Sequence, residues 1–219
     1  MRVYKFYSAK WGLDALYRER LKLSTDRDIN DPFEFLAAGK NKASREEARK
    51  IRSALFKEQG IISFCETWSE PLLWSHYADN HRGLALGFDL KDRVGFPVKY
   101  TDKRVQLPPG VGNVYRFGED SNFDHSIKVT KHDAWSYEQE VRVFRGLNSS
   151  IYENGFYFRA FNDIGELSQV IIGTDYSSLQ NSELAVELES KGVKILTARL
   201  AFKNFSMVPQ NIKTMQENL

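Results

Sequence analysis

The pattern of hydrophobic and polar positions predicts strands and helices in an irregular order. Short apolar or alternating stretches indicate strands over residues 3–8, 61–65, 83–89, 98–101, 140–145, 156–160, 169–173 and 193–200. Apolar residues at helical spacing, with flanking cap signals, indicate helices over residues 11–21, 43–58, 70–79, 126–135 and 177–191. Because strands and helices do not alternate regularly, the sequence indicates an α+β sheet domain rather than a doubly wound fold.

Turn and cap residues predict where several of these elements begin and end. Ser44 and Glu47 have the spacing of a capping box at the start of the helix over 43–58, and Gly60 marks its end. Pro71 suits the first turn of the helix over 70–79. Residues 21–34 and 105–124 are predicted to be loops, because prolines, glycines and short polar residues gather there.

Composition narrows the class of protein. The 219 residues are 42% hydrophobic and 27% charged, which is typical of a globular chain, and without a linker-like stretch we expect one domain over residues 1–219. No apolar run approaches the ~20 residues of a membrane span, and the N-terminus has no signal-peptide pattern. Cys65 is the only cysteine, which excludes a disulfide framework and fits a reducing compartment. We therefore expect a cytoplasmic protein without membrane contact.

Charge and motif content exclude several common sites. The net charge of +2 is too small to indicate nucleic-acid binding by itself. The sequence has no P-loop, no G-x-G-x-x-G, no H-E-x-x-H and no G-x-S-x-G. His76 and His81 are five residues apart, which is a poor spacing for two ligands on one helix face. No metal site is expected.

The first chemically unusual segment is residues 63–89, where a predicted helix lies between two strands. Trp74 and Tyr77 are three residues apart, so both can pack the helix onto a sheet. The alternative is a flat aromatic slot for a planar ligand, with Ser75 and His76 supplying hydrogen bonds.

The second segment, residues 135–144, carries Glu138 and Glu140 at the entry to a predicted strand. In an extended chain two such residues share a face and lie roughly 7 Å apart. They are either part of a solvated face, with Lys131 or Arg142 as partners, or a carboxylate pair at a strand end. In such a pair one carboxylate would stabilise positive charge and the other would position a nucleophile.

The third segment, Asn30-Asp31-Pro32-Phe33-Glu34, is typical of a turn in which Asp31 caps a helix. It is alternatively a loop that covers a pocket. A nuclease that uses Asp31, Glu138 and Glu140 with a divalent metal is a further possibility.

These motifs together resemble a bacterial domain family of unknown function. The residues that carry the resemblance are VYKFYS near the start, NDPFE, LLWSHYADNHRGLALGFD and WSYEQEVRVF, which together span about residues 3–175. The resemblance defines a family and implies little about its function.

The order of the motifs also resembles, more distantly, the diphtheria-toxin-like and poly-ADP-ribose-polymerase-like branch of the ADP-ribosyltransferase superfamily. Lys5 stands where that family has His or Arg on its first strand, and Tyr7 follows it. Phe64 and Tyr77 stand at the two aromatic positions that sandwich nicotinamide, and Glu140 stands at the catalytic glutamate. The resemblance implies an ADP-ribosyltransferase-like split mixed β-sheet core with flanking helices.

The same resemblance implies an NAD-dependent mono-ADP-ribosyltransferase, in which NAD is the substrate. Glu140 and Glu138 would be catalytic, and Trp74 and His76 would join Lys5, Tyr7, Phe64 and Tyr77 in binding NAD. The acceptor would be a macromolecule (RNA, DNA or protein), and an antitoxin or immunity partner fits a toxin or phage-defence effector. The alternatives are an NAD glycohydrolase and a non-catalytic binding module with an inherited pocket.

Overall fold

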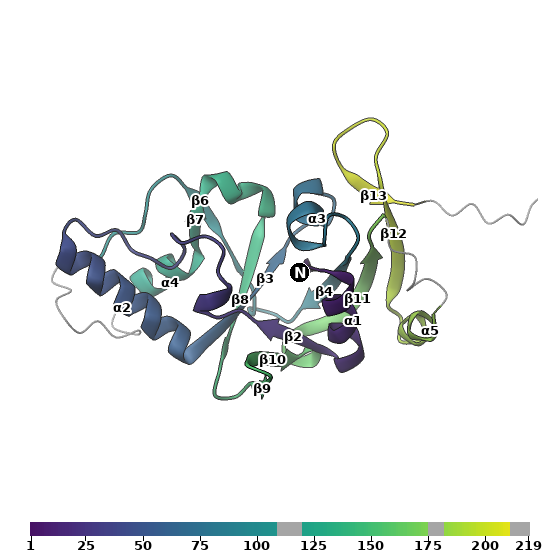
Figure 1. The fold of residues 1–219 in the computed structure, drawn as a ribbon, viewed down its shortest axis with the longest axis horizontal. Helices are drawn as coiled ribbons and strands as arrows, with labels where there is room; N and C mark the ends of the chain where they lie inside the picture. Colours follow the sequence, from purple (N-terminus) through teal and green to yellow (C-terminus); the bar gives the residue numbers. More distant parts are fainter. Residues whose placement is uncertain (109–119, 175–181, 211–219) are drawn as a thin grey trace, which may run out of the picture. The chain divides into compact units, whose positions relative to one another are not determined.

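The computed structural model describes residues 1–108, 120–174 and 182–210. These residues fold into two compact units, each built from segments that are separate in the sequence. Unit 1 comprises Met1–Arg18, Thr67–Asp89 and Gly165–Leu219, and unit 2 comprises Glu19–Glu66 and Leu90–Ile164. Both units combine strands with flanking helices, so the predicted α+β class is confirmed (Figure 1). That the whole chain is one domain stays a prediction.

Unit 1 contains a mixed sheet with the strand order β13-β12-β11-β4-β1. Its strands are β1 (Arg2–Tyr7), β4 (Leu84–Leu90), β11 (Gly165–Ile172), β12 (Lys194–Leu200) and β13 (Met207–Pro209). The pairs β1–β4 and β12–β13 are antiparallel, whereas β11 and β12 are parallel. The strand β4 is apolar and buried except at Asp89, whereas β11 is buried mainly over its apolar second half, Val170 to Ile172, as expected for strands in the middle of a covered sheet.

The helices of unit 1 are α1 (Ala9–Arg18), α3 (Pro71–Tyr77) and α5 (Glu183–Ser190). Helix α1 packs closely on β4 at Gly12, where an added Cβ would lie 2.7 Å from Leu84 Cδ1. Helix α3 begins as predicted, because Pro71 occupies its first turn and the Glu70 side chain accepts a hydrogen bond from the Leu72 N–H.

The strands of unit 2 are hydrogen-bonded in the orders β3-β8-β5, β2-β10-β9 and β6-β7, of which the last two are small separate sheets. Its strands are β2 (Arg20–Leu23), β3 (Gln59–Cys65), β5 (Phe96–Pro97), β6 (Lys99–Thr101), β7 (Thr130–His132), β8 (Glu140–Gly146), β9 (Ile151–Glu153) and β10 (Phe156–Ala160). All pairs in the first two orders are antiparallel, and β6 and β7 are parallel. The longest pairing, β3 with β8, places Cys65 opposite Glu140.

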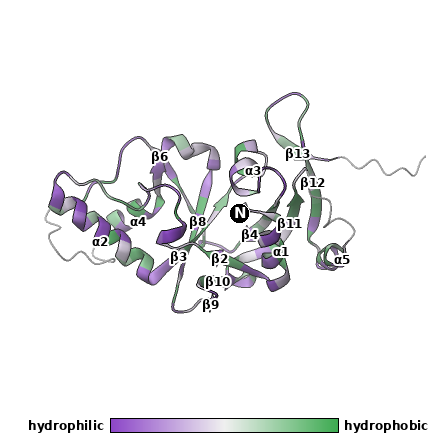
Figure 2. Cartoon of the chain, viewed as in Figure 1, coloured by the Kyte–Doolittle hydropathy of each residue, from purple (hydrophilic) through white to green (hydrophobic). Residues whose placement is uncertain are grey.

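Helices α2 (Lys42–Glu58) and α4 (Ser121–Val129) belong to unit 2, together with the 3₁₀ turns η1 (Asp26–Asp28), η2 (Asp133–Glu138) and η3 (Phe161–Asp163). Along α2, hydrophilic and hydrophobic residues alternate at helical spacing (Figure 2). Its apolar face is buried at Ala48, Ile51 and Leu55. The face pattern thus explains why this segment forms a helix and which side it buries.

Several predicted boundaries are wrong. The cap of α2 is Asn41, whose side chain accepts from the Ser44 N–H, rather than Ser44 with Glu47, and Gly60 already lies in β3. The helix predicted over 11–21 ends at Arg18, and the helix predicted over 126–135 is replaced by the end of α4, then β7 and η2. The predicted loop over 21–34 contains the end of β2 and η1. Parts of the loop predicted over 105–124 and of the helix predicted over 177–191 lie outside the described residues.

Among the described residues, no helix combines the length and the apolar character that crossing a membrane requires.

Candidate functional site

A buried cluster of charged side chains lies at the start of β8 in unit 2. Its members are Glu34, Lys131, Glu138, Glu140 and Arg142, and each is between 0% and 6% exposed. Three carboxylates and two cations give the cluster a formal charge of −1. Charges of this kind are almost never buried unless they are paired, so the contacts within the cluster decide its behaviour.

Lys131 joins all three carboxylates of the cluster. Its Nζ lies 2.8 Å from Glu34 Oε1, 2.6 Å from Glu138 Oε2 and 3.2 Å from Glu140 Oε2. Arg142 joins two of them: its guanidinium donates to Glu140 Oε1 and Oε2, both at 2.9 Å, and to Glu34 Oε2 at 2.6 Å. The fork of Arg142 therefore holds Glu140 in a two-point pair, which is the strong geometry for this interaction.

The backbone explains how Glu138, Glu140 and Arg142 meet. Glu140 and Arg142 are two residues apart on β8, so their side chains leave the same face of the strand. Glu138 ends η2, and Gln139 adopts a left-handed conformation with φ 43°. The Glu140 N–H then donates to Tyr100 Oη at 2.7 Å. The turn at Gln139 thus brings Glu138 to Lys131 although Glu138 lies outside the strand.

Phe35 covers Arg142 with its ring. The guanidinium carbon lies 4.6 Å from the ring centroid, and the edge of Phe56 meets the same ring at 5.2 Å. Phe35 has φ 58°, an unusual conformation for a bulky residue that the surrounding contacts must stabilise. This backbone conformation places Glu34 and Phe35 on the cluster together.

Two carboxylates of the cluster, Glu140 and Glu34, have pKa shifts of opposite sign. Burial disfavours the charge of Glu140, but Arg142 and Lys131 outweigh it and lower the pKa of Glu140 to about 2. Burial raises the pKa of Glu34, and the charge of Glu140 adds to this against the opposing charges of Arg142 and Lys131. Burial works against the charge of Lys131 too, yet the three carboxylates outweigh it and raise its pKa. Two neighbouring carboxyl groups thus differ in acidity because their surroundings differ.

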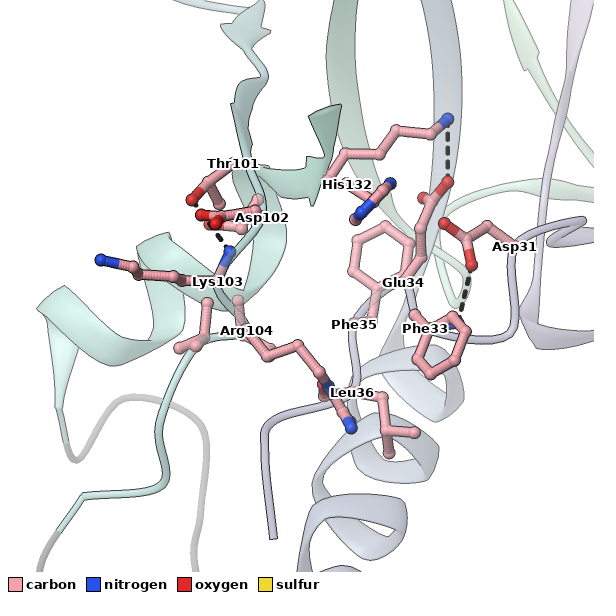
Figure 3. A pocket seen from close by; sticks show the side chains of 14 residues that line it. Asp31, Phe33, Glu34, Phe35, Leu36, Thr101, Asp102, Lys103, Arg104 and His132 are labelled. Atoms are coloured by element: carbon pink, nitrogen blue, oxygen red, sulfur yellow. Dashed lines mark hydrogen bonds and ion pairs between the residues drawn. The ribbon is translucent and has the colours of Figure 1, made fainter. Parts of the chain in front are cut away.

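A pocket of about 250 Å³ adjoins the cluster within unit 2 (Figure 3). Glu34 and Lys131 are the cluster members that line it. Its other lining residues are Asp31, Phe33, Phe35, Leu36, Thr101, Asp102, Lys103, Arg104, Val105, Ile127, Thr130 and His132. One wall is the segment 31–36 and the other is the segment after β6. The pocket therefore joins an apolar lining to a charged pair.

The segment 31–36 is held in place by short-range hydrogen bonds. Asp31 Oδ1 accepts from the Phe33 N–H at 2.9 Å, and Asp31 is 4% exposed. Arg104 fixes the end of the segment by donating to the carbonyls of Leu36 and Ala37, at 3.0 and 2.9 Å. Residues 32–35 form a turn, so the predicted turn is confirmed, but they form no helix, so the predicted helix cap is wrong. The segment lines the pocket, and that it covers a pocket stays a prediction.

The expected NAD-binding residues are divided between the two units. Lys5, Tyr7, Trp74, His76 and Tyr77 lie in unit 1, whereas Phe64, Glu138 and Glu140 lie in unit 2. Within unit 1, Lys5 Nζ lies 5.5 Å from the Tyr7 ring centroid, and the rings of His76 and Tyr77 are 6.0 Å apart. Within unit 2, the structure brings Glu138 and Glu140 together through Lys131.

Two of the expected stacking rings have no exposed surface. Phe64 and Trp74 are both 0% exposed. Trp74 donates its indole N–H to the Trp68 carbonyl at 2.6 Å and meets the Phe6 ring edge to face at 5.2 Å. Packing of the helix onto the sheet is therefore what Trp74 does in this structure. Tyr77 is half-buried and His76 is exposed.

The glutamate pair differs from its sequence expectation in two ways. The alternative of a solvated face is wrong, because Glu138 and Glu140 are each 4% exposed. The expectation that the chain is extended through both glutamates is also wrong, because the backbone of Gln139 adopts the left-handed conformation. The predicted partners, Lys131 and Arg142, are confirmed.

Glu34 is the residue of the site that the sequence reasoning missed. The NDPFE motif contains it, but its position 108 residues before Arg142 hides the contact. The contact between Glu140 and Arg142 is indicated by their spacing, because residues two apart on a strand place their opposite charges on one strand face.

Comparisons of the chain with family models, with curated proteins and with solved structures found no match. Within the described ranges, no group of three or more His, Cys, Asp or Glu side chains is placed to hold a metal ion. In the cluster the carboxylate oxygens are bonded to Lys131 and Arg142, so a metal ion there would have to displace these cations.

Proposed function

We propose that the protein cleaves the nicotinamide–ribose bond of NAD and transfers ADP-ribose to a macromolecule, nucleic acid or protein. The single observation that carries the proposal is a pocket whose charged wall belongs to a cluster with one excess negative charge. Motif resemblance to the ADP-ribosyltransferases supports the same class and, with it, a split mixed sheet as the core. As a toxin or defence effector, such an enzyme would be accompanied by an antitoxin or immunity partner.

The chemistry needs negative charge beside the ribose. When the bond from ribose C1′ to the nicotinamide nitrogen breaks, its electron pair leaves with neutral nicotinamide, and C1′ develops oxocarbenium character. A fixed carboxylate cluster of charge −1 stabilises that positive charge without reorganising. An acceptor oxygen or nitrogen then bonds to C1′ and loses its proton to a base.

Glu34 is the carboxyl of the cluster that faces the pocket, and we assign it the role of this base. Its raised pKa strengthens it as a proton acceptor. Its own oxygens accept from Lys131 and Arg142, as those of Glu140 accept from Arg142, so what distinguishes Glu34 is its place in the pocket lining. Glu140, which the resemblance makes catalytic, and Glu138, which is bonded to Lys131, are not among the lining residues. In this arrangement Glu138 and Glu140 act as positioning residues that fix Lys131 and Arg142 around Glu34.

The pocket volume limits what part of NAD it can take. At about 250 Å³ it lies below the usual ~300–1,000 Å³ of ligand pockets, so it suits the nicotinamide riboside end rather than the whole dinucleotide. Phe33, 61% exposed at the wall, offers a ring face to nicotinamide, and Lys103 offers a charge to a phosphate.

One observation favours a second candidate, a non-catalytic binding module. Complete pairing of Glu140 is what a structural ion cluster under a binding pocket also needs. The two candidates differ in whether NAD is consumed.

The test is NAD turnover by the purified protein, with cell lysate and total RNA as acceptors, following released nicotinamide and labelled ADP-ribose. We expect wild type to release nicotinamide, and Glu34→Gln to lower the rate at least about 100-fold, as loss of a catalytic acid–base group does. Glu140→Gln should lower it as well. Glu46→Gln, on the exposed face of α2, is the matched control and should keep wild-type turnover.

Each outcome separates the candidates. Release of nicotinamide without transfer of labelled ADP-ribose to any acceptor identifies an NAD glycohydrolase. No turnover by folded wild type supports the binding module. Wild-type rates in both folded Glu34→Gln and Glu140→Gln would refute the proposed site.

A further inference from the structure

Unit 2 has a second pocket, and no residue of the charged cluster lines it. It has a volume of about 480 Å³. Four parts of the unit line it: the end of β2 with η1, the last turns of α2, Leu147, and the β9–β10 hairpin. Its lining residues are Leu23, Thr25, Asp26, Arg27, Asp28, Ser53, Phe56, Lys57, Leu147, Tyr152, Gly155, Phe156 and Tyr157.

The hairpin presents aromatic rings at this pocket. Asn154 and Gly155 join β9 to β10 with φ 52° and 85°, the positive values that a tight two-residue hairpin turn requires. The register then pairs Tyr152 with Tyr157, whose ring centroids are 4.8 Å apart. Tyr152 is 64% exposed and Phe156 is 39% exposed. Large rings with this much free surface are typical of an interaction site rather than of a core.

The acidic residues of the pocket are already neutralised. Asp26 accepts from Arg52 at 2.7 Å, and Asp28 accepts from Lys22 at 2.5 Å. Because both carboxylates are paired, neither leaves a negative charge that would repel an anionic ligand.

The basic residues of the pocket, Arg27 and Lys57, are exposed on η1 and on α2. In the part of the chain that the structure describes, neither has an ion-pair or hydrogen-bond partner. The lining with its paired neighbours, Lys22 and Arg52, therefore carries a formal charge of +2. Two cations and exposed rings face one cavity.

We infer that this pocket binds single-stranded nucleic acid. Unstacked bases pack on exposed tyrosine and phenylalanine faces, and the phosphates between them meet arginine and lysine. Tyr152 supplies the main stacking face, and Phe156, whose ring already has Lys22 Nζ 4.4 Å from its centroid, supplies a second ring beside a cation. Arg27 and Lys57 supply the phosphate contacts. An anionic lipid surface would use the cations but not a recessed aromatic wall, and an acidic peptide lacks the flat groups that stack there.

This inference rests on the second pocket alone and not on NAD cleavage. Binding is measured without NAD, so its failure leaves the proposed enzyme standing, and loss of NAD turnover leaves the nucleic-acid site standing. If both hold, single-stranded nucleic acid is the first acceptor to test for ADP-ribose transfer.

The experiment is fluorescence anisotropy of a labelled oligothymidylate titrated with the full chain, between about 50 and about 200 mM salt. Tyr152→Ala should raise Kd about tenfold at every salt concentration, the loss typical of one stacked base. The double variant Arg27→Gln with Lys57→Gln should raise Kd at low salt and reduce the slope of log K against log salt by about 1.4, two phosphate contacts on a single strand.

The matched control is Arg49→Gln with Lys91→Gln, which removes two exposed cations of unit 2 outside the pocket. It should leave Kd within about twofold of wild type. Circular dichroism and thermal melting check that each variant is folded.

Three results would overturn the inference. The first is no binding by wild type at low salt. The second is an equal loss in the control double variant, which would show a diffuse charge effect. The third is wild-type affinity in Tyr152→Ala together with full competition by polyglutamate, which would indicate an acidic protein partner instead.

Discussion

The two pockets of unit 2 use charge in opposite ways. Beside the first pocket, Lys131 and Arg142 are buried and paired with carboxylates of the cluster, and Arg142 also donates to the Lys128 carbonyl. At the second pocket, Arg27 and Lys57 are exposed and have no such partners in the described residues. Buried paired charges fix the shape of a site, whereas exposed charges remain available to a ligand. Stability should therefore depend on the first set and binding on the second.

The largest expected effect is on Arg142, the most buried member of the cluster. Arg142→Met removes the partner of Glu34 and Glu140 and changes the cluster charge from −1 to −2. Leaving buried carboxylates without a partner costs about 3–5 kcal/mol of the unfolding free energy. Urea unfolding followed by circular dichroism measures it.

Arg27→Met at the second pocket is the comparison for this loss. It removes the same group from an exposed position, so it should change the unfolding free energy by less than about 0.5 kcal/mol. Equal losses in the two variants would mean that the cluster is not the structural element described above.

The next effect is on the pH dependence of stability. The pKa of Glu140 is about 2 in the folded protein, below the ordinary 4.5, so its contribution is present above pH 4.5 and is lost as the pH falls through the folded pKa. Between pH 4.5 and 3 the loss is on the order of 1–2 kcal/mol. Glu140→Gln should flatten this part of the profile in urea unfolding.

Glu34 should act in the other direction. Its pKa is raised on folding, so the folded state gains stability relative to the unfolded state as the pH falls through that raised value. Glu34→Gln should therefore remove a gain in stability that wild type shows as the pH falls toward 4.5, whereas Glu140→Gln flattens the loss below pH 4.5. A profile that changes alike in both variants would contradict the opposite shifts assigned to the two carboxyls.

The sequence predicted the elements better than the site. Strands such as β8 and β3 were recognisable because their apolar residues follow a local period, which depends on neighbours in the chain. The short strand β7 was not recognisable, because it exists through its pairing with β6, some thirty residues earlier. The end of the first helix at Arg18 was not recognisable either. Local patterns carry no information on such partners.

The same limit applies to the charged cluster. Glu140 and Arg142 could be paired from their spacing on one strand, but Glu34 joins them from a distant turn whose backbone at Phe35 is unusual. Burial of Glu138 and Glu140 depends on that turn and on Lys131. The sequence therefore predicted the partners of the carboxylates correctly, and of the two alternatives that it left open, the solvated face is wrong.

The smallest expected effect is on the two exposed cations of the second pocket, Arg27 and Lys57. The double variant Arg27→Gln with Lys57→Gln should change the unfolding free energy by less than about 0.5 kcal/mol, because neither charge has a partner to lose. Removing two like charges from one rim relieves mutual repulsion, so a slight gain in stability is the expected sign. Thermal melting at low salt, where screening is least, is the sensitive measurement. A loss above about 1 kcal/mol would show that these cations serve the fold, and the second pocket would then resemble the first.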